Sequence, residues 1–270
     1  MPPIFLHYKS LVDKYLLDFL ESKKLNLGEV NTYGPDLIEK IKIVAVAGKT
    51  IRGSLVLLSY CFSNKAPSVE SLKAAAAMEL FQTALIIHDD IMDHDEIRRG
   101  MPAMHKQYGS VPMAICTGDV LFFMAFELLG SIKTDNKTFG RIIRLASREY
   151  QSVAVAQMAD ISGTAKTKED LLSLYTNKTA RYTFALPLML GATLAGTTKD
   201  VLKYLESFGV SAGILFQIRD DILDHKPMLG SHEIQAYKKA AEESIKRLPV
   251  PETKKDILRD LLNFVIVRKI

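Results

Sequence analysis

Apolar residues recur at intervals of three and four along almost the whole chain, which is the pattern of amphipathic helices. The longest such segment covers residues 68–93, SVESLKAAAAMELFQTALIIHDDIMD, and contains no Gly or Pro. Ser68, at its start, is a residue type that commonly begins a helix. A second long segment covers residues 200–224, DVLKYLESFGVSAGILFQIRDDILD, with Asp200 as the expected N-cap.

Two glycines of the second segment, Gly209 and Gly213, lie four residues apart and therefore on one helix face. Because they carry no side chains, we expect a neighbouring helix to approach closely there. Further helices are expected over residues 5–23, 50–62, 111–131, 138–160, 168–195, 233–247 and 252–268. Turn-forming residues separate these segments, and alternating strand patterns are almost absent. The sequence therefore predicts an all-α bundle.

Composition excludes some classes of function. The net charge is only +4, from 35 basic and 31 acidic residues, and no basic run interleaved with aromatics predicts a nucleic-acid partner. Cys61 and Cys116 are far apart, which argues against a disulfide framework or a zinc site and favours a reduced, cytoplasmic setting. The longest apolar-leaning stretch noted, YTFALPLMLGATLAG, is too short to cross a membrane. Since the N-terminus also lacks a signal-peptide pattern, we expect a soluble protein without a transmembrane segment.

Two acidic clusters carry the candidate chemistry. Residues 88–100, HDDIMDHDEIRRG, and residues 219–224, RDDILD, both contain the pattern D-D-x-x-D. Residues four apart share a helix face, so each cluster presents a pair of carboxylates that repel one another. Such pairs, without nearby Cys or paired His, suit a hard cation that prefers oxygen, above all Mg²⁺. The two pairs of carboxylates are Asp89 with Asp93 and Asp220 with Asp224.

A solvated helix end is the alternative interpretation of either cluster alone. Two copies, each directly after an apolar run (ALIIH and GILFQI), favour metal sites at the rim of a cavity. Magnesium usually completes its coordination with phosphate oxygens of a substrate. Basic residues that could hold such phosphates occur in three places, although each alone is more often a surface residue. They are Arg98 and Arg99, Lys49 and Arg52 in AGKTIRG, and Lys178 beside Thr179.

An apolar helix face descends from the first cluster. Leu85, Gln82, Phe81 and Met78 follow one another below Asp89. They are either ordinary core residues or the wall of a tunnel under a phosphate-binding rim. Together with the charged clusters, a tunnel predicts an amphiphilic substrate with a diphosphate head and a hydrocarbon tail.

These motifs resemble those of the trans-isoprenyl diphosphate synthases, the all-α prenyltransferases that make geranylgeranyl, farnesyl and related diphosphates. The matching segments are GKTIR, ELFQTALIIHDDIMDHDEIRRG, TGD, NKTARYTFALPLMLGATLAG and FQIRDDILD, in the family's order and over most of residues 45–225. The archaeal-type short-chain synthases are most similar. The resemblance implies the isoprenoid synthase fold, with residues 1–270 as a single domain of long antiparallel helices around a central cavity.

The same resemblance implies an Mg²⁺-dependent condensation of isopentenyl diphosphate with an allylic diphosphate, with three Mg²⁺ ions bound together with diphosphate. The protein would be a homodimer. The implied metal site comprises Asp89, Asp93, Asp220 and Asp224, with Asp90, Asp221 and Asp224 giving support through waters. The residues implied to bind isopentenyl diphosphate are Lys49, Arg52, Gln82 and Arg99. The implied catalytic residues, which would also bind the allylic diphosphate, are Arg98, Lys178, Thr179 and Gln217, with Phe216 lining the substrate cavity.

The chain departs from the family's pattern in four places. Gln82 stands where the family usually has His, and Ala47 and Gly53 replace the usual Gly and Pro around GKxxR. After Asp224 the family's Gly-Lys and Gly-Lys-Thr segments are missing, so either this segment is shortened in the protein or a stretch is absent from this sequence. Lys226 is therefore not assigned the missing lysine's role.

Product length depends on the residues below the first aspartate cluster. The family's tunnel floor falls at Ala84 and Leu85, neither of which is aromatic, so Phe81 would form the floor one turn deeper. We predict a C20 product, geranylgeranyl diphosphate, with a C25–C30 product as the main alternative. A terpene cyclase would normally lack the second intact motif and the GKxxR and RR cations. A non-catalytic subunit of a heteromeric synthase would tend to lose the aspartates, all six of which are present here.

Overall fold

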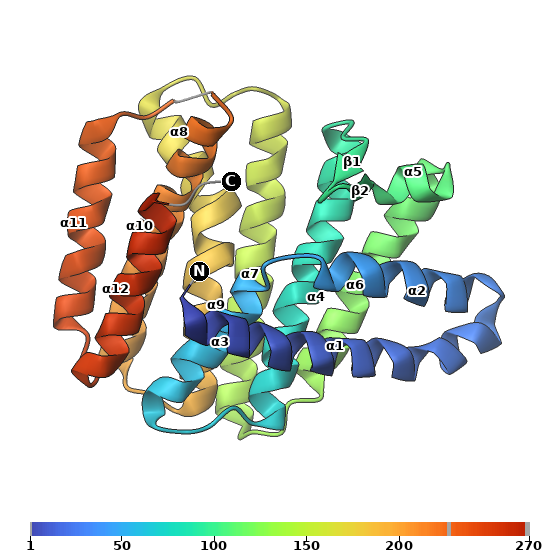
Figure 1. The fold of residues 1–270 in the computed structure, drawn as a ribbon, viewed down its shortest axis with the longest axis horizontal. Helices are drawn as coiled ribbons and strands as arrows, with labels where there is room; N and C mark the ends of the chain where they lie inside the picture. The colour runs from blue at the N-terminus through green and yellow to red at the C-terminus, as the bar shows by residue number, and fades with distance from the viewer. Residues whose placement is uncertain (1, 226–227, 268–270) are drawn as a thin grey trace. The chain divides into compact units, whose positions relative to one another are not determined.

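The computed structural model describes residues 2–225 and 228–267, and these are almost entirely helical (Figure 1). The prediction of an all-α fold is confirmed. The helices are α1 (Pro3–Val30), α2 (Tyr33–Val46), α3 (Ile51–Tyr60), η1 (Cys61–Ser63), α4 (Val69–Met92), α5 (Met104–Tyr108), α6 (Val111–Gly130), α7 (Asn136–Ile161), α8 (Lys168–Leu174), η2 (Tyr175–Ala185), α9 (Leu186–Ala195), α10 (Lys199–Leu223), α11 (Ser231–Arg247) and α12 (Glu252–Val267). Two short antiparallel strands, β1 (Ile97–Arg98) and β2 (Met101–Pro102), form a hairpin after α4.

The predicted helices agree with the observed ones in place, and differences lie mainly at their ends. Ser68 caps α4 as expected: its hydroxyl accepts a hydrogen bond from the backbone N–H of Ser71. The expected cap of α10 was wrong, because Thr198 rather than Asp200 accepts a bond, from the N–H of Val201. The sequence analysis also missed α2, although its buried residues Ile38, Ile41 and Ala45 follow helical spacing.

The segment predicted as one helix over residues 168–195 is helical throughout, but its middle part is not an α-helix. Over η2 the backbone forms a π-helix, in which each N–H bonds to the carbonyl five residues earlier, as Leu186 does to Arg181 at its end. Each turn therefore contains more residues than an α-helical turn. This changes which side chains of η2 share a face.

The chain divides into two compact units. The first comprises Met1–Leu6, Leu55–Pro67 and Thr134–Ile270, and the second comprises His7–Ser54 and Ser68–Lys133. In the first unit, α10 packs against η2, α9 and α11, and α7 packs against η2 and α9. In the second unit, α4 packs mainly against α6, with fully buried alanines such as Ala76 and Ala77 on α4.

The two glycines of α10 make the predicted close approach within the first unit. A Cβ on Gly209 would lie 2.6 Å from the Cα of Ala185, and one on Gly213 would lie 2.4 Å from the Cα of Ala180. Both distances are shorter than atoms tolerate. The absence of these two side chains therefore sets the distance between α10 and η2.

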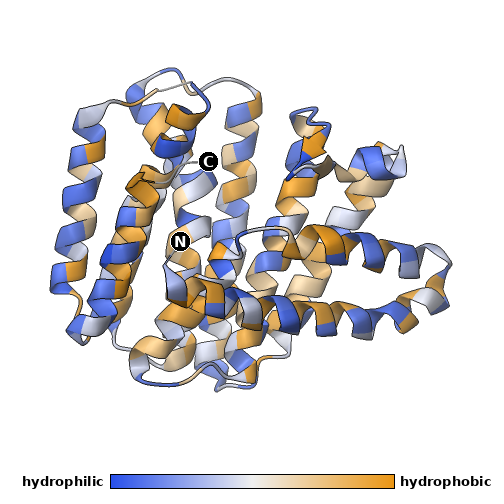
Figure 2. Cartoon of the chain, in the orientation of Figure 1, coloured by the Kyte–Doolittle hydropathy of each residue, from blue (hydrophilic) through white to orange (hydrophobic). Residues whose placement is uncertain are grey.

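Hydropathy varies around most helices, and α11 and α12 show separate hydrophilic and hydrophobic faces (Figure 2). Among the described residues, α6 and α10 are long and apolar enough to cross a membrane, a feature of α6 that the sequence analysis overlooked. In the most apolar part of α10, 61% of the residues are buried inside the protein, and 44% in α6. Since the core helices of soluble proteins meet the same criteria, these two helices are weak evidence for a membrane span.

Candidate active site

Both aspartate motifs lie in the last turn of a long helix. Asp93 is the C-cap of α4, in the second unit, and Asp224 is the C-cap of α10, in the first unit. The C-terminal end of a helix carries partial negative charge, so carboxylates there cost stability instead of adding it. This placement indicates that the carboxylates serve a purpose other than capping.

Asp90 is the buried member of the first motif. Its side chain is only 2% exposed and accepts a hydrogen bond of 2.6 Å from Nε of Arg98. The same guanidinium donates to Asp95 at 2.8 Å. Burial raises the pKa of the Asp90 carboxyl, and Arg98 opposes this shift only in part. Arg98 is therefore held beside the motif by two carboxylates, while Asp89 is half-buried and Asp93 is exposed.

The hairpin between β1 and β2 presents Arg99. Its backbone has a φ of +54°, in the left-handed region that few residues other than glycine adopt. Its Nη1 donates to the carbonyl of Val44 at 3.1 Å, and a Cβ on Gly48 would lie 2.8 Å from its guanidinium. Gly48, the first glycine of AGKTIRG, therefore leaves the space that this guanidinium occupies. Arg99, Arg98 and Asp90 together line a small crevice in the second unit.

A buried carboxylate lies among the predicted isopentenyl diphosphate residues. Glu79, on α4, is 5% exposed and accepts a 2.7 Å hydrogen bond from the backbone N–H of Gly53. A proline at position 53, as in the family's usual pattern, would have no N–H for this bond. Burial raises the pKa of the Glu79 carboxyl, while the Gly53 bond and the charges of Arg52 and Arg99 oppose the shift.

The charges of Arg52 and Arg99 thus both act on the Glu79 carboxylate, together with that of Asp13. Gln82, largely buried at 9% exposure, lies three residues further along α4 and hence on a neighbouring part of the same face. Lys49 is exposed in the short segment between α2 and α3. Arg52 and Arg99 are therefore brought together by the fold, and Gln82 and Lys49 belong to adjacent segments.

The second motif is connected to η2 by side-chain hydrogen bonds. The hydroxyl of Thr179 donates to Oε1 of Gln217 at 2.8 Å, and Nε2 of Gln217 donates to Oδ1 of Asp221 at 2.9 Å. The phenol of Tyr175 donates to the other oxygen of Asp221. Burial, and then the bond to Asp221, raise the pKa of Tyr175, so it is a hydrogen-bond donor at neutral pH. The predicted catalytic residues Thr179 and Gln217 are thus in contact.

Lys178 forms an ion pair with Asp160, in the last turn of α7. Sequence analysis missed Asp160, Glu79 and Tyr175. A carboxylate at the C-terminal end of α7 opposes the helix dipole, as in the two motifs, and this signal could have identified Asp160. Tyr175 and Glu79 carry no comparable signal, because their contacts depend on how helices pack.

The predicted tunnel residues lie where α4 meets α6. Phe81 is buried, with its ring centroid 6.2 Å from that of Phe122 and 5.1 Å from that of Phe126, edge to face. Ala84 is fully buried and Leu85 is half-buried. Phe216, on α10, contacts Phe184 of η2 at 5.4 Å between centroids. Around Phe81, the packing of α4 against α6 is therefore apolar and rich in aromatic rings.

The side chains of both motifs fit magnesium. Within residues 2–225 and 228–267, no three acidic, His or Cys side chains form a cluster that would hold a metal ion by themselves. Magnesium, however, needs only one or two carboxylates and takes its other ligands from water and phosphate. The pairs Asp89 with Asp93 and Asp220 with Asp224 offer only oxygen donors of this kind. Lys226, beyond the second motif, lies outside the described residues.

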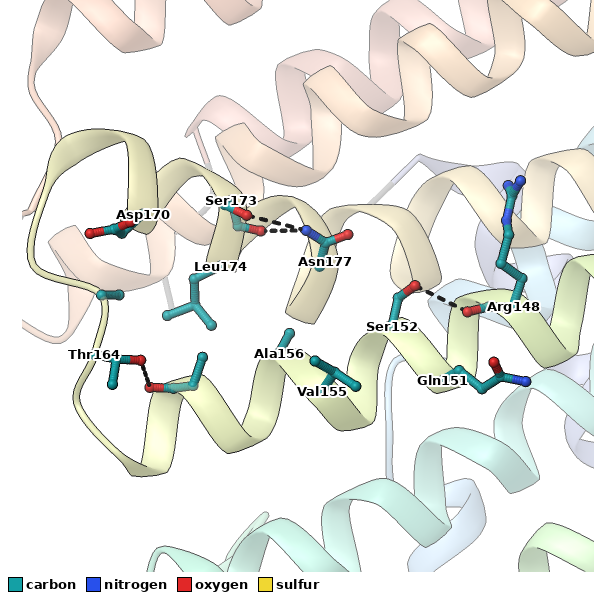
Figure 3. Close-up of a pocket in the computed structure, with 12 residues that line it drawn as sticks. Arg148, Gln151, Ser152, Val155, Ala156, Thr164, Asp170, Ser173, Leu174 and Asn177 are labelled. Carbon is teal, nitrogen blue, oxygen red and sulfur yellow. Dashed lines mark hydrogen bonds between the residues drawn. The ribbon is translucent and has the colours of Figure 1, made fainter.

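A separate pocket in the first unit lies between α7 and the α8–η2 segment (Figure 3). None of the predicted site residues lines it, although Asn177 precedes Lys178 in the chain. Two of its polar side chains bond within the chain: Ser152 donates to the carbonyl of Arg148, and Asn177 donates to that of Ser173 (Figure 3). Since none of the predicted site residues lines this pocket, we do not assign the candidate chemistry to it.

Residues 37–233 match the model of one protein family, described as polyprenyl synthetase. The chain belongs to the polyprenyl synthetase family. A short chain isoprenyl diphosphate synthase of Methanocaldococcus jannaschii is 36% identical over 184 residues, which cover 67% of this chain and 55% of that protein. The chain thus matches about half the length of such curated relatives. A geranylfarnesyl diphosphate synthase of Aeropyrum pernix is 28% identical over 95% of this chain and 84% of its own length.

Solved structures place this family member in the isoprenoid synthase fold. A geranylgeranyl pyrophosphate synthase from Corynebacterium glutamicum, complexed with isoprenyl diphosphate and magnesium, superposes with a TM-score of 0.88. The match covers 97% of this chain and 99% of that one, at 20% sequence identity. At this identity the similarity concerns the fold alone, and it agrees with the fold that the resemblance implied.

Proposed function

We propose that the protein is an Mg²⁺-dependent trans-prenyltransferase that condenses isopentenyl diphosphate with an allylic diphosphate, head to tail. The observation that carries this proposal is that both aspartate motifs stand at helix C-terminal ends, each with its own bonded partners. Membership of the polyprenyl synthetase family and the names of its relatives support the same reaction. The activity of the whole protein is proposed here on those grounds.

The two proposed substrates would be bound through their diphosphates, mainly by basic side chains. In the second unit, Arg52 and Arg99 around Glu79, with Lys49 and Gln82, would bind the diphosphate of isopentenyl diphosphate. Arg98, from the second unit, and Lys178, from the first, would bind the allylic diphosphate. Because both are ion-paired to carboxylates, they are held in place before substrate arrives.

The chain's residues would bind, orient and shield the reacting groups. Bound Mg²⁺ would supply positive charge that stabilises the diphosphates. The allylic C–O bond breaks, the isopentenyl double bond attacks the allylic carbon, and the released diphosphate takes the proton that the new product loses. Thr179 and Gln217 lie beside the developing cation, where their oxygen atoms stabilise it. Phe216 and the aromatic wall near Phe81 keep water away from it.

The finer features of the site belong to the same proposal. We place three Mg²⁺ ions on Asp89, Asp93, Asp220 and Asp224, with Asp90 and Asp221 in supporting roles. The hydrogen bonds of Asp90 to Arg98 and of Asp221 to Gln217 support this division. We also propose that the chain works as one catalytic domain, and in the cytoplasm, in keeping with its free cysteines Cys61 and Cys116.

A homodimer is supported by apolar residues that the single chain leaves exposed. On α6, Phe123 is 75% exposed, and Ile115 and Phe126 are also exposed. On α7, Met158 and Val155 are 69% and 66% exposed. Contiguous exposed apolar surface on a helix commonly marks a protein interface. Light scattering of the purified chain would measure the mass, and a monomer at micromolar concentration would contradict this part of the proposal.

For the product we propose geranylgeranyl diphosphate. Ala84 and Leu85 are not aromatic, so Phe81 and its partners Phe122 and Phe126 form the first bulky layer below the motif. The names of the relatives refer to products of different chain lengths, and one relative is a geranylfarnesyl diphosphate synthase. A C25–C30 product is therefore the competing outcome.

The experiment combines the purified chain with radiolabelled isopentenyl diphosphate, farnesyl diphosphate and Mg²⁺, followed by chain-length analysis of the product. We expect a C20 product, loss of activity with EDTA, and recovery with added Mg²⁺. Asp89→Ala and Asp220→Ala should each lower turnover by about 100-fold. Asp200→Asn, in the first turn of α10, is the matched control and should retain activity.

The same assay separates the rival classes. A terpene cyclase would release hydrocarbon or alcohol from the allylic diphosphate without consuming isopentenyl diphosphate. A non-catalytic subunit would show no turnover alone. Either result would overturn the proposed function.

A further inference from the structure

The hydrogen bonds between η2 and α10 form one continuous chain of donors and acceptors. Four positions of α10, each four residues after the last, face η2: Gly209, Gly213, Gln217 and Asp221. The two glycines set the distance between the segments, and the two polar residues then reach Thr179 and Tyr175. Asp220 and Asp224 belong to a neighbouring face, since successive residues of a helix are rotated by about 100°.

The direction of these bonds is fixed by chemistry. The carboxylate of Asp221 can only accept, so it takes one hydrogen from Tyr175 and another from the amide nitrogen of Gln217. The amide oxygen of Gln217 must then face Thr179 and accept its hydroxyl hydrogen. The hydroxyl hydrogen of Thr179 is therefore donated to Gln217. Only the lone pairs of the Thr179 hydroxyl oxygen remain available to a substrate.

We propose that Tyr175 is a positioning residue for the transfer reaction. Through Asp221 and Gln217 it holds Thr179 as a hydrogen-bond acceptor, which suits a hydroxyl next to a developing cation. Its bond also fixes Asp221 and thereby the backbone turn that carries Asp220 and Asp224. This inference rests on the proposed function, and it extends that function to a residue outside all the recognised motifs.

Tyr175 is placed for this role by its surroundings. Its side chain is 5% exposed and packs in an apolar cluster with Leu171, Ile214 and Ile218. The ring cannot easily turn away from Asp221 in such a cluster, because apolar side chains pack around it. The π-helical backbone adds a further residue to the turn between Tyr175 and Ala180, so that Tyr175, Thr179 and Ala180 all meet α10.

The test uses Tyr175→Phe, which removes the phenol oxygen and keeps the ring in the cluster. Tyr237→Phe is the matched control, because Tyr237 is half-buried against the same cluster. We expect Tyr175→Phe to lower kcat by about 10- to 100-fold. The KM for isopentenyl diphosphate should change less than twofold, because its proposed ligands are elsewhere. Tyr237→Phe should match the wild type in both constants.

A second measurement does not depend on turnover. Isothermal titration calorimetry with Mg²⁺ and inorganic diphosphate reports on how well the second aspartate motif is held. Tyr175→Phe should weaken this binding by about 10-fold, and Tyr237→Phe should leave it unchanged. Circular dichroism and thermal melting establish that each variant is folded.

Asp221→Asn provides the test if Tyr175→Phe does not fold. It keeps the side-chain volume but lets an amide nitrogen face Gln217, so the direction of the bonds to Thr179 is no longer fixed. We expect the same loss in kcat with little change in the KM for isopentenyl diphosphate. Equal kcat and diphosphate affinity in wild type, Tyr175→Phe and Tyr237→Phe would overturn the inference. If the wild type itself consumes no isopentenyl diphosphate, the proposed function fails instead.

Discussion

The backbone of Ala180 lies against Gly213 so closely that a Cβ on the glycine would come within 2.4 Å of the Cα of Ala180. Four residues further along α10, Gln217 bonds to Thr179, the residue before Ala180. The glycine thus determines whether the candidate catalytic pair can meet. The packing of α10 against η2 and the hydrogen bond between Thr179 and Gln217 therefore depend on the same contact.

Gly213→Ala should therefore destabilise the protein. Alanine favours a helix over glycine by about 0.5–1 kcal/mol, but an added carbon in a packed contact costs about 1–3 kcal/mol. We expect a net loss, measured by urea unfolding, and a lower kcat because α10 moves away from Thr179. Gly130→Ala, at the end of α6 where no atom lies within 4 Å of the new Cβ, is the control and should be neutral or slightly stabilising. A Gly213→Ala protein as stable as Gly130→Ala would contradict the importance of this contact.

The sequence predicted most of the helices and the close approach at Gly209 and Gly213, because both depend on local spacing. It did not predict the π-helix of η2, since the same apolar pattern fits an α-helix through residues 168–195. Nor could it identify the bond between Tyr175 and Asp221, which joins residues 46 apart and depends on the register of two packed segments. The roles of Asp89 and Asp220 remain predictions from their motifs, whereas the pairing of Arg98 with Asp90 comes from the structure alone.

Arg98→Gln should leave the buried carboxylate of Asp90 without its charged partner. Loss of a charged hydrogen-bond partner in such a site costs about 1–3 kcal/mol, so the free energy of unfolding should fall by this amount. Turnover should fall as well, because Arg98 is a proposed ligand of the allylic diphosphate. The control is Arg259→Gln, which removes an exposed ion pair with Glu252 and Asp256 and should leave both properties near wild type. Equal stability of the two variants would show that Asp90 does not depend on Arg98.

Ala84→Phe should shorten the product. Ala84 is fully buried on α4, one turn above the aromatic contact of Phe81 with Phe126, so a ring there would fill the space before that layer. Chain-length analysis after incubation with isopentenyl and geranyl diphosphates should move from C20 towards C15. Ala76→Ser, also buried on α4 but in its N-terminal half, serves as the control and should keep the product length. An unchanged product profile from a folded Ala84→Phe protein would reject this assignment of the tunnel.

Glu149→Gln should alter how stability depends on pH. The Glu149 side chain is 2% exposed and accepts hydrogen bonds from Arg181 at 2.6 and 2.7 Å and from Arg148 at 2.8 Å. Burial alone would raise the pKa of Glu149, but these bonds and charges outweigh it, so the pKa lies below its ordinary value. The folded state then holds fewer protons on this group than the unfolded state does. Its contribution is therefore fully present above the unfolded pKa of about 4.3 and is lost as the pH falls through the lower, folded pKa.

We expect Glu149→Gln to lose about 1.5–3 kcal/mol of unfolding free energy at pH 7, the usual effect of losing bonds between charged groups. Urea unfolding of wild type and variant between pH 7 and pH 3 should give curves that converge on the acid side, because the wild-type carboxyl becomes protonated there. Glu206→Gln is the matched control: Glu206 bonds to the same Arg181 at 3.0 Å but is 36% exposed, so water screens the pair and the effect should be smaller. A difference between wild type and Glu149→Gln that stays constant over this pH range would mean that the ion pair is not the cause of the stabilisation.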